Sequence, residues 1–334
     1  MENYSLLKDL LINHESFLLT THVNPDADAI GSQLALFEIL NRLGKNVRAI
    51  NHSATPYNLS FLDSGNIIEK FDENTHVKLF DEIDCIIFLD LNQANRVVKM
   101  ENGIRNFTGM KICIDHHQNP ESFTNYFFGG TEYSATGEVI FDFIEQTGIV
   151  EIDYRLAELL YSAIMTDTGS FRFEKTSSKI HKIIAQLLET GINPTDIYDK
   201  IYDQFEFSRI KLLGKALETI KLDDTKQIAF MEITKEDMKQ SGATEADIDG
   251  FVNYCLSIKN IKIGILFYEL KDGVKISFRS KGKIPVNKLA AEFNGGGHIN
   301  ASGARLFNKA IGEIKDEIIL KAQQYLESEV KNAF

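Results

Sequence analysis

The stretch KICIDHH, residues 111–117, joins a strand-like apolar run to one aspartate and two histidines. Three further acidic groups follow apolar segments in the same way: HVNPDAD at 22–28, FLD at 88–90 and MTDTGSF at 165–171. Carboxylates are rarely buried without a partner, so acids at the ends of core segments are informative. If these segments are neighbours in one layered domain, their imidazoles and carboxylates meet at one point. Such a donor set suits divalent metal ions.

Short apolar strands alternate with helical segments through the first half of the chain. The predicted strands are ESFLLTTH, VRAIN, CIIFLD and KICID. From Asp28 to Gly44 apolar residues recur at helical spacing, which makes His22 to Asp28 a strand-to-helix loop. A later predicted helix, YRLAELLYSAIMTDTG, carries Asp167 near its C-terminal end. The pattern predicts an α/β fold with a doubly wound, mainly parallel sheet, where ligands collect at the carboxyl ends of the strands.

The pattern changes after Asp224. QIAFMEIT, IKIGILFYEL and GVKISFRS are predicted strands, and residues 271–273 form a hairpin turn between the last two. PVNKLAAEF is a predicted short helix, NGGGH a flexible loop, ASGARLF a last strand and the stretch from Ala310 a long amphipathic helix. A chain of 334 residues is long enough for two cores. We therefore expect a metal-binding domain over 1–195, a helical linker over 196–223 and a smaller α+β domain over 224–334.

Composition limits the partners of this chain. The net charge is −12, and 43% hydrophobic with 25% charged residues is typical of a globular protein. Affinity for long nucleic acid comes from many Lys and Arg contacts to phosphates, so we expect no binding of long duplexes. Cys85, Cys113 and Cys255 are predicted to be reduced, buried residues. Because the sequence shows neither a secretory signal nor an apolar run of about 20 residues, we expect a cytoplasmic protein without membrane contact.

Each acidic group also has a purely structural explanation. Asp26 or Asp28 can cap the following helix. Asp90 can form an Asx turn with Asn92, and a surface loop can be rich in Asp and His. Asp167 is the least informative by itself, because a negative charge near a helix C-terminus is unfavourable unless a cation lies nearby. For each group taken singly, these alternatives stay open.

A basic segment and a glycine loop form a second candidate site. KISFRSKGK brings four cationic residues close together in sequence, namely Lys275, Arg279, Lys281 and Lys283. Glycine amides can approach an anion closely, and a guanidinium can fork to two phosphate oxygens. The candidate substrate-binding residues are Arg279, Gly295, Gly296, Gly297 and His298. A solvated basic hairpin beside a flexible loop is the structural alternative.

Taken in chain order, these motifs resemble those of the DHH phosphoesterase superfamily, and the second domain resembles its DHHA1 partner domain. The resemblance rests on HVNPDADAIGS, FLD, DHH and TDTGSF in the first domain and on SFRS and GGGHINASGA in the second. Within the superfamily, the chain is similar to the stand-alone nano-RNase and pAp phosphatase branch, also labelled exopolyphosphatase-related. Asn294 stands where many relatives have glycine, and Ser302 where alanine is frequent; neither position is an implied metal ligand.

The resemblance implies a site for two Mn²⁺ ions, with Mg²⁺ or Co²⁺ as alternatives. His22, Asp26 and Asp90 would bind one ion. The ligands of the second ion would be Asp28, Asp90, His116 and Asp167. Asp90 would thus bridge the two ions.

The resemblance also implies roles around the ions. Asp115 would orient a histidine, which we take to be His116, and His117 would contact the phosphate or assist proton transfer. The expected catalytic residues are therefore Asp90, Asp115 and His117. Arg279, the glycine loop and His298 would hold a second phosphate or the substrate end across an interdomain cleft.

The expected function is a Mn²⁺-dependent phosphoesterase that hydrolyses short oligoribonucleotides and 3′-phosphoadenosine 5′-phosphate through a water that bridges two metal ions. Its partners would be short RNA oligonucleotides or small nucleotides, and a homodimer is a further expectation. Enzymatic alternatives are hydrolysis of linear or cyclic di-AMP and exopolyphosphatase action. A metal-dependent protein that senses nucleotides without turnover is the alternative from another class.

Overall fold

The computed structural model describes residues 3–76 and 78–332, and the side chains of these residues except His298 and 328–332. It divides into two compact units, Met1–Gln204 and Phe205–Phe334, each built around its own six-stranded sheet. The predicted linker over 196–223 contains most of α8 (Pro194–Tyr202), which lies in the first unit, and all of α9 (Phe207–Glu218), which lies in the second. The division of the chain therefore falls inside that segment.

The sheet of the first unit is parallel throughout, with the order β3-β2-β1-β4-β5-β6. Its strands are β1 (Ser16–Thr20), β2 (Asn46–Asn51), β3 (Ile68–Lys70), β4 (Cys85–Leu89), β5 (Met110–Asp115) and β6 (Tyr126–Gly129). The prediction of a parallel sheet is confirmed, and the four predicted strands are its four central ones. The edge strands β3 and β6 were not predicted, because they are short and partly exposed.

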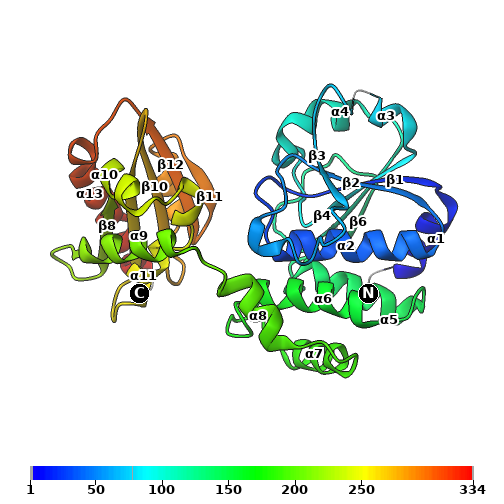
Figure 1. Ribbon diagram of the computed structural model, residues 1–334. Coiled ribbons are helices and arrows are strands. Elements are labelled where there is room, and N and C mark those ends of the chain that lie inside the picture. Colours follow the sequence, from blue (N-terminus) through cyan, green and yellow to red (C-terminus); the bar gives the residue numbers. More distant parts are fainter. Residues whose placement is uncertain (1–2, 77, 333–334) are drawn as a thin grey trace. The chain divides into compact units, whose positions relative to one another are not determined.

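Helices cover both faces of this sheet, as a doubly wound fold requires (Figure 1). Along β1, Phe17 and Leu19 belong to the core on one face and Leu18 to the core on the other. The first face packs against α1 (Tyr4–Asn13), α2 (Ala27–Arg42), α5 (Thr136–Thr147) and α6 (Tyr154–Asp167), and α7 (Ser178–Glu189) packs on α6. The second face packs against α3 (Leu79–Glu82), the 3₁₀ segment η2 (Ala94–Met100) and α4 (Glu101–Asn106).

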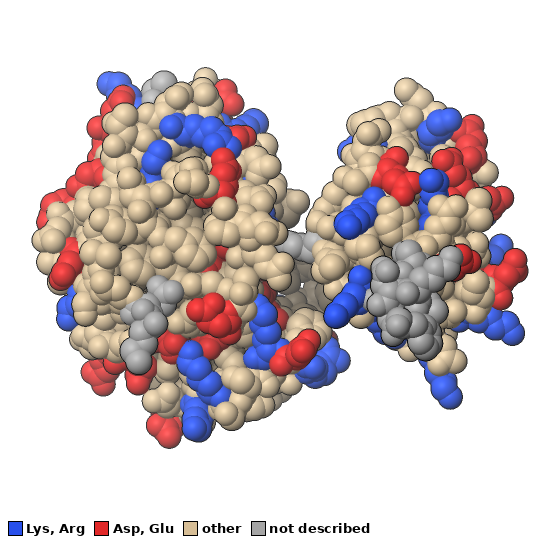
Figure 2. Space-filling model, turned by 180° about the vertical axis from the view of Figure 1, so that it is seen from behind, with Lys and Arg blue, Asp and Glu red and all other residues tan. Residues whose placement is uncertain are grey.

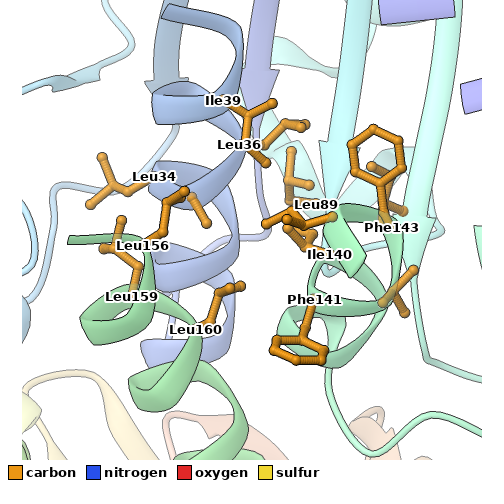
Figure 3. Packing of buried hydrophobic residues seen from close by; sticks show 14 of the residues in the cluster. Leu34, Leu36, Ile39, Leu89, Ile140, Phe141, Phe143, Leu156, Leu159 and Leu160 are labelled. Atoms are coloured by element: carbon orange, nitrogen blue, oxygen red, sulfur yellow. The ribbon is translucent and has the colours of Figure 1, made fainter. Parts of the chain in front are cut away.

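Two glycines let α2, α5 and α6 approach closely. A Cβ atom on Gly31 of α2 would lie 2.6 Å from the carbonyl oxygen of Leu159 in α6. A Cβ atom on Gly137 of α5 would lie 2.6 Å from the Cβ of Ala163 in α6. Figure 3 shows the apolar side chains of these three helices packed into one core. The three helices carry several of the acidic residues discussed below, so this packing sets how those residues meet.

The sheet of the second unit is mixed, with the order β11-β12-β10-β9-β8-β7 and one parallel pair, β8 with β9. Its strands are β7 (Lys221–Leu222), β8 (Ile228–Ile233), β9 (Ile263–Leu270), β10 (Gly273–Ser280), β11 (Gly296–His298) and β12 (Ala301–Phe307). The predicted hairpin is confirmed, because Leu270 and Gly273 are paired across it. The prediction that NGGGH is wholly a loop was wrong, since its last three residues pair with β12 as an edge strand.

Helices pack on both faces of the second sheet. One face packs against α12 (Val286–Ala291) and α13 (Ile311–Asn332), and the other against α9, α10 (Lys235–Ser241), the 3₁₀ turn η3 (Glu245–Ile248) and α11 (Val252–Ser257). Alternate residues of β10 are buried in the first core, while Lys275, Ser277 and Arg279 are half-buried on the second face. This face of β10 is therefore open enough to meet a ligand.

The surface and the cysteines agree with an ordinary globular chain. Figure 2 shows Lys and Arg side chains mixed with Asp and Glu on one face of each unit, without a continuous basic surface. All three cysteines are buried and unbonded, as predicted. Among the described residues, every helix is too short or too polar to span a membrane.

Candidate metal centre

The predicted metal ligands converge at the carboxyl edge of the first sheet. His22 follows β1, Asp90 follows β4 and His116 follows β5. Asp26 and Asp28 lie at the start of α2, and Asp167 ends α6. Ligand atoms within each of three groups lie within 4.8 Å of one another: His22 with Asp26 and Asp90, Asp28 with His116 and Asp167, and Asp90 with His116 and His117. All six predicted ligands fall into these groups. The shared membership of Asp90 and His116 joins the groups into one centre.

Asp90 lies at the middle of this centre. Its side chain is 2% exposed, and its backbone adopts φ of 59°, which is uncommon outside glycine. One carboxylate oxygen lies 3.2 Å from His22 Nε2, and the other lies 3.4 Å from His116 Nε2. The hydroxyl of Thr136 donates to that second oxygen at 3.0 Å. A strained backbone and three polar neighbours are typical of a functional position.

Asp28 is anchored by the start of α5. The backbone N–H groups of Thr136 and Gly137 donate to its two carboxylate oxygens at 2.7 and 2.9 Å, and Ser32 Oγ donates at 3.0 Å. The carboxylate is fully buried. Helix N-termini favour negative charge, so the start of α5 orients the Asp28 carboxylate.

The centre carries more negative charge than the protein itself balances. Burial, with the neighbouring Asp90 and Asp167 carboxylates, raises the pKa of Asp28 well above its usual value. Burial acts to lower the pKa of His116, but the carboxylates of Asp167 and Asp90 outweigh it and raise this pKa to about 11. Both shifts mean that the protein alone would take up protons here. A divalent cation relieves the same repulsion, so the residues fit a metal.

The geometry of His116 supports the same conclusion. Both of its ring nitrogens are buried without a hydrogen-bond partner, although Nε2 lies 3.0 Å from an oxygen of Asp167 and 3.4 Å from one of Asp90. Buried polar atoms normally form hydrogen bonds. His116 Nε2 is thus close to two carboxylates but not aligned to hydrogen-bond with either. Ligands that converge on a common metal ion have this arrangement. His22 adds to this set, because its Nδ1 bonds to the carbonyl of Val23 and Nε2 faces the centre.

Asp115 departs from its predicted role. From the sequence we expected Asp115 to support His116. Its oxygens instead accept hydrogen bonds from the ring Nδ1 of His117 at 2.8 Å and from the backbone N–H of His117 at 3.1 Å. Asp115 is fully buried at the end of β5, where the chain turns back on itself. The side chain therefore orients the second histidine of the pair and not the first.

Asp26 both caps a helix and belongs to one of the candidate metal groups. One of its oxygens accepts from the backbone N–H of Ala29 at 3.1 Å and so caps α2. A carboxylate has two oxygens with several lone pairs, so capping leaves room for a further ligand. The helix cap and the metal group thus use the same residue, and the structural alternative does not exclude the functional one.

Thr136 is the main residue of the centre that the sequence reasoning missed. Its hydroxyl contacts Asp90 and its backbone N–H contacts Asp28, so it links two carboxylates. The signal in the sequence was the segment Ser-Ala-Thr-Gly, residues 134–137, at the start of α5, where small polar residues often meet a ligand or an acid.

The predicted substrate-binding residues belong to the second unit, whereas the metal groups belong to the first. Arg279 is half-buried on β10, and its Nη1 donates to the carbonyl of Phe278 at 3.0 Å. Gly295 and Gly297 are required by close packing, since a Cβ atom would lie 2.2 Å from the carbonyl oxygen of Gly303 and 2.5 Å from that of Ala301, respectively. Gly296 faces open space. The side chain of His298 lies outside the described residues.

Comparisons with known proteins agree with this architecture. Residues 16–164 match the family described as DHH family, N-terminal domain, and residues 225–328 match the DHHA1 domain. The Bifunctional oligoribonuclease and PAP phosphatase NrnA of Bacillus subtilis (strain 168) is 30% identical over 302 residues, which cover 88% of this chain and 90% of that protein.

Two solved structures share the fold. An exopolyphosphatase-related protein from Bacteroides fragilis is 36% identical, with a TM-score of 0.90 and coverage of 97% of this chain and 95% of the other. RecJ in complex with Mn²⁺ from Thermus thermophilus is 11% identical, with a TM-score of 0.54, and covers 96% of this chain and 53% of its own. At that identity the second likeness is one of fold alone.

Proposed function

Because the chain belongs to the DHH family of phosphoesterases, we propose that it is a Mn²⁺-dependent hydrolase of short oligoribonucleotides and of 3′-phosphoadenosine 5′-phosphate. The observation that carries this proposal is the set of ligand groups that share Asp90 and His116 at one sheet edge. The name of the Bacillus subtilis relative supports the substrate class. A net charge of −12 and the mixed charges of the surface favour a short substrate over a polymer.

We assign His22, Asp26 and Asp90 to one ion. For the second ion we assign Asp28, Asp90, His116 and Asp167. Carboxylates mixed with imidazoles favour Mn²⁺ over Mg²⁺, which prefers oxygen ligands and keeps several waters. When bound, two such ions supply the charge that acidifies a bridging water and offsets the charge developing on the phosphate.

The chain's own groups orient the reaction. Asp115 holds the ring of His117 through Nδ1, and in this orientation we assign His117 to contact the phosphate and to give a proton to the leaving oxygen. Thr136 fixes one oxygen of Asp90, and the start of α5 fixes Asp28, so that both carboxylates keep their directions during the reaction.

The second unit supplies Arg279 and the glycine loop as proposed substrate-binding residues. The strand neighbours of Arg279 are Gly264 and Ala301. Burial lowers the pKa of Arg279 from its usual value, and in the described part of the chain it forms no ion pair. The Asp249 carboxylate acts on Arg279 without forming an ion pair, so this desolvated cation still favours an anionic ligand. The role proposed for His298 rests on its sequence motif.

Exopolyphosphatase action is the second candidate, because the structural relative at 36% identity is described as exopolyphosphatase-related. Polyphosphate shares the repeated phosphates of an oligonucleotide but has no base or sugar. Linear and cyclic di-AMP are further substrates to compare. They present the same phosphodiester, with free ends in the linear form and none in the cyclic form.

A substrate panel tests the proposal. The purified protein would be assayed with Mn²⁺, Mg²⁺ and Co²⁺ on RNA dinucleotides, 3′-phosphoadenosine 5′-phosphate, linear and cyclic di-AMP, polyphosphate and a long single strand. We expect the highest kcat/KM on the dinucleotides or the bisphosphate with Mn²⁺. Degradation of the long strand as fast as the dinucleotides, or fastest turnover of polyphosphate, would contradict the proposal.

A further inference from the structure

A group of basic side chains lies beside the metal centre and has no part in the mechanism above. This basic cluster consists of His52, Lys70, Arg96 and Lys99. His52 follows β2, Lys70 ends β3, and Arg96 and Lys99 belong to η2, which follows β4. All four therefore come from the carboxyl edge that also carries the metal ligands.

Backbone contacts tie Arg96 to the loop that carries the first ligands. The N–H of Val23, next to His22, donates to the carbonyl of Arg96 at 2.8 Å. Arg96 is therefore the member of the basic cluster that borders the metal centre.

A second set of contacts places the other members next to the same loop. The N–H of Asn24 donates to Ser53 Oγ at 3.1 Å, which brings the residue after His52 against the metal-binding loop. Lys70 pairs in register with Asn51, directly before His52. The basic cluster thus runs from the metal centre outward over the ends of β2 and β3.

The charges of the basic cluster are not neutralised by the protein. Within the residues that the structure describes, Lys70, Arg96 and Lys99 form no ion pair, whereas the nearby Arg48 is paired with Glu69 at 2.8 Å. His52 Nδ1 is buried without a hydrogen-bond partner, and burial together with Lys99 and Lys70 lowers the pKa of His52. In a chain with 48 acidic and 36 basic residues, the three unpaired cations Lys70, Arg96 and Lys99 favour an anionic ligand.

The backbone between Arg96 and Lys99 is strained. Val98 has φ of 49° and ψ of −104°, a conformation that a β-branched residue rarely adopts. It breaks η2, so that the chain changes direction between the two cations. Strain of this kind persists where the surrounding structure enforces it and is concentrated at ligand sites.

We propose that the basic cluster is an anion subsite that binds a second phosphate of the substrate, next to the phosphate that is hydrolysed at the metal centre. The ligand class is a nucleotide or oligonucleotide with at least two phosphates. This inference rests on the proposed function for its position in the reaction, but binding of a bisphosphate by the cluster can be measured without turnover. Arg96 would contact the nearer part of the substrate, and Lys99 and Lys70 the part farther from the metals.

The kinetic test compares substrates that differ by one phosphate. The double variant Lys70→Ala/Lys99→Ala and the wild type would be assayed on the dinucleotide ApA and on the same dinucleotide with an added 5′- or 3′-phosphate. We expect the preference for at least one of the added phosphates, as a ratio of kcat/KM values, to fall about tenfold in the double variant. An unchanged preference for both phosphates would overturn the proposal.

The matched control removes one cation at the opposite edge of the same sheet. Lys111 lies at the amino end of β5, roughly 13 Å along the strand from Asp115, and also forms no ion pair in the described part of the chain. Lys111→Ala should retain the phosphate preference of the wild type. An equal loss in this control would show a general effect of net charge and would also overturn the proposal.

A binding experiment separates this inference from the proposed function. Calorimetric titration with 3′-phosphoadenosine 5′-phosphate and with AMP, in the presence of a chelator, measures affinity without hydrolysis. The double variant should lose about tenfold in affinity for the bisphosphate and less for AMP. If the wild type hydrolyses no dinucleotide but this difference is found, the function fails and the subsite stands. If hydrolysis occurs and the difference is absent, the subsite fails alone.

Discussion

The two sheets have the same number of strands but hold very different amounts of buried charge. The first unit buries Asp28, Asp90 and Asp115 together with His22 and His116, whereas Asp223 is the only buried carboxylate among the described side chains of the second unit. All strands of the first sheet point the same way, so their carboxyl ends gather at one edge. The second sheet is mostly antiparallel and spreads its strand ends over two edges. Strand direction, more than composition, concentrates the ionisable groups.

Two buried carboxylates show what this difference does to charge. Asp223 accepts hydrogen bonds from Thr225 Oγ1 at 2.7 Å, from Gln323 Nε2 at 2.9 Å and from the backbone of Ile228 at 3.0 Å. Burial acts to raise its pKa, but these donors outweigh burial and lower it. Asp28 also accepts three hydrogen bonds, yet its pKa is raised, because burial and the carboxylates of Asp90 and Asp167 outweigh these donors. One site is complete without a cation and the other is not.

The largest expected effect follows from removing the shared carboxylate of the first unit. Asp90→Asn should lower kcat/KM on the best substrate roughly 1,000-fold or more and reduce the bound Mn²⁺, because Asp90 is assigned to both ions. Metal content would be measured by atomic emission after gel filtration. Asp223→Asn is the control for loss of a buried acid and should keep both activity and metal. Unaltered activity in Asp90→Asn would refute the site assignment.

The next effect concerns the packing that positions the centre. Gly31→Ala would place a methyl group 2.6 Å from the carbonyl oxygen of Leu159, so α2 and α6 must move apart. We expect the free energy of unfolding to fall by about 1–3 kcal/mol and Mn²⁺ affinity to weaken, as measured by urea unfolding and metal titration.

The control for that substitution comes from the second unit. Gly214 lies inside α9 with open space around it, so Gly214→Ala should leave metal affinity as it is and stabilise the helix by about 0.5–1 kcal/mol. Equal effects of the two substitutions would mean that the contact between α2 and α6 does not position the centre.

A smaller effect is expected from the cation of the second unit. Arg279→Ala should raise KM for oligonucleotides about tenfold, since it removes a charged hydrogen-bond donor, while the Mn²⁺ content stays constant. Arg305→Ala is the matched control, because Arg305 is exposed and already paired with Asp272 at 2.9 Å. Loss of metal in Arg279→Ala would contradict the assignment of Arg279 to substrate binding alone.

The smallest effect is a pH-dependent one in the second unit. The folded state lowers the pKa of Asp223, so its contribution to stability is present above the unfolded value of 3.8 and is lost as the pH falls through the folded value. Asp223→Asn should therefore cost about 1 kcal/mol at pH 7 and progressively less below pH 3.8. Urea unfolding followed by circular dichroism at several pH values measures this. A constant cost at all pH values would contradict the assignment.

Sequence reasoning selected six residues that the structure brings together, because carboxylates and imidazoles after apolar strands have few structural explanations when they occur together. It also found the parallel sheet from the alternation of strands and helices. The edge strands β3 and β11 escaped it, since a three-residue strand containing Glu, Lys or several glycines has no periodic apolar pattern.

The direction of side chains was harder to predict than their identity. Asp115 forms hydrogen bonds with His117 and not with His116, and the path of the chain after β5 determines this pairing. Thr136 joins the centre because α5 starts against Asp28, and this depends on close packing at Gly31 and Gly137. Such contacts join residues far apart in the sequence, and no local pattern records them.

The spread of the ligands along the chain has a consequence for biosynthesis. His22 and Asp167 lie at opposite ends of the proposed ligand set, and a ribosome that adds 5–20 residues per second separates them by on the order of ten seconds. During that interval the growing chain carries some of the donors without α6. The complete donor set exists only once α6 has docked, so we expect the newly made protein to acquire its full complement of metal in one late step of folding.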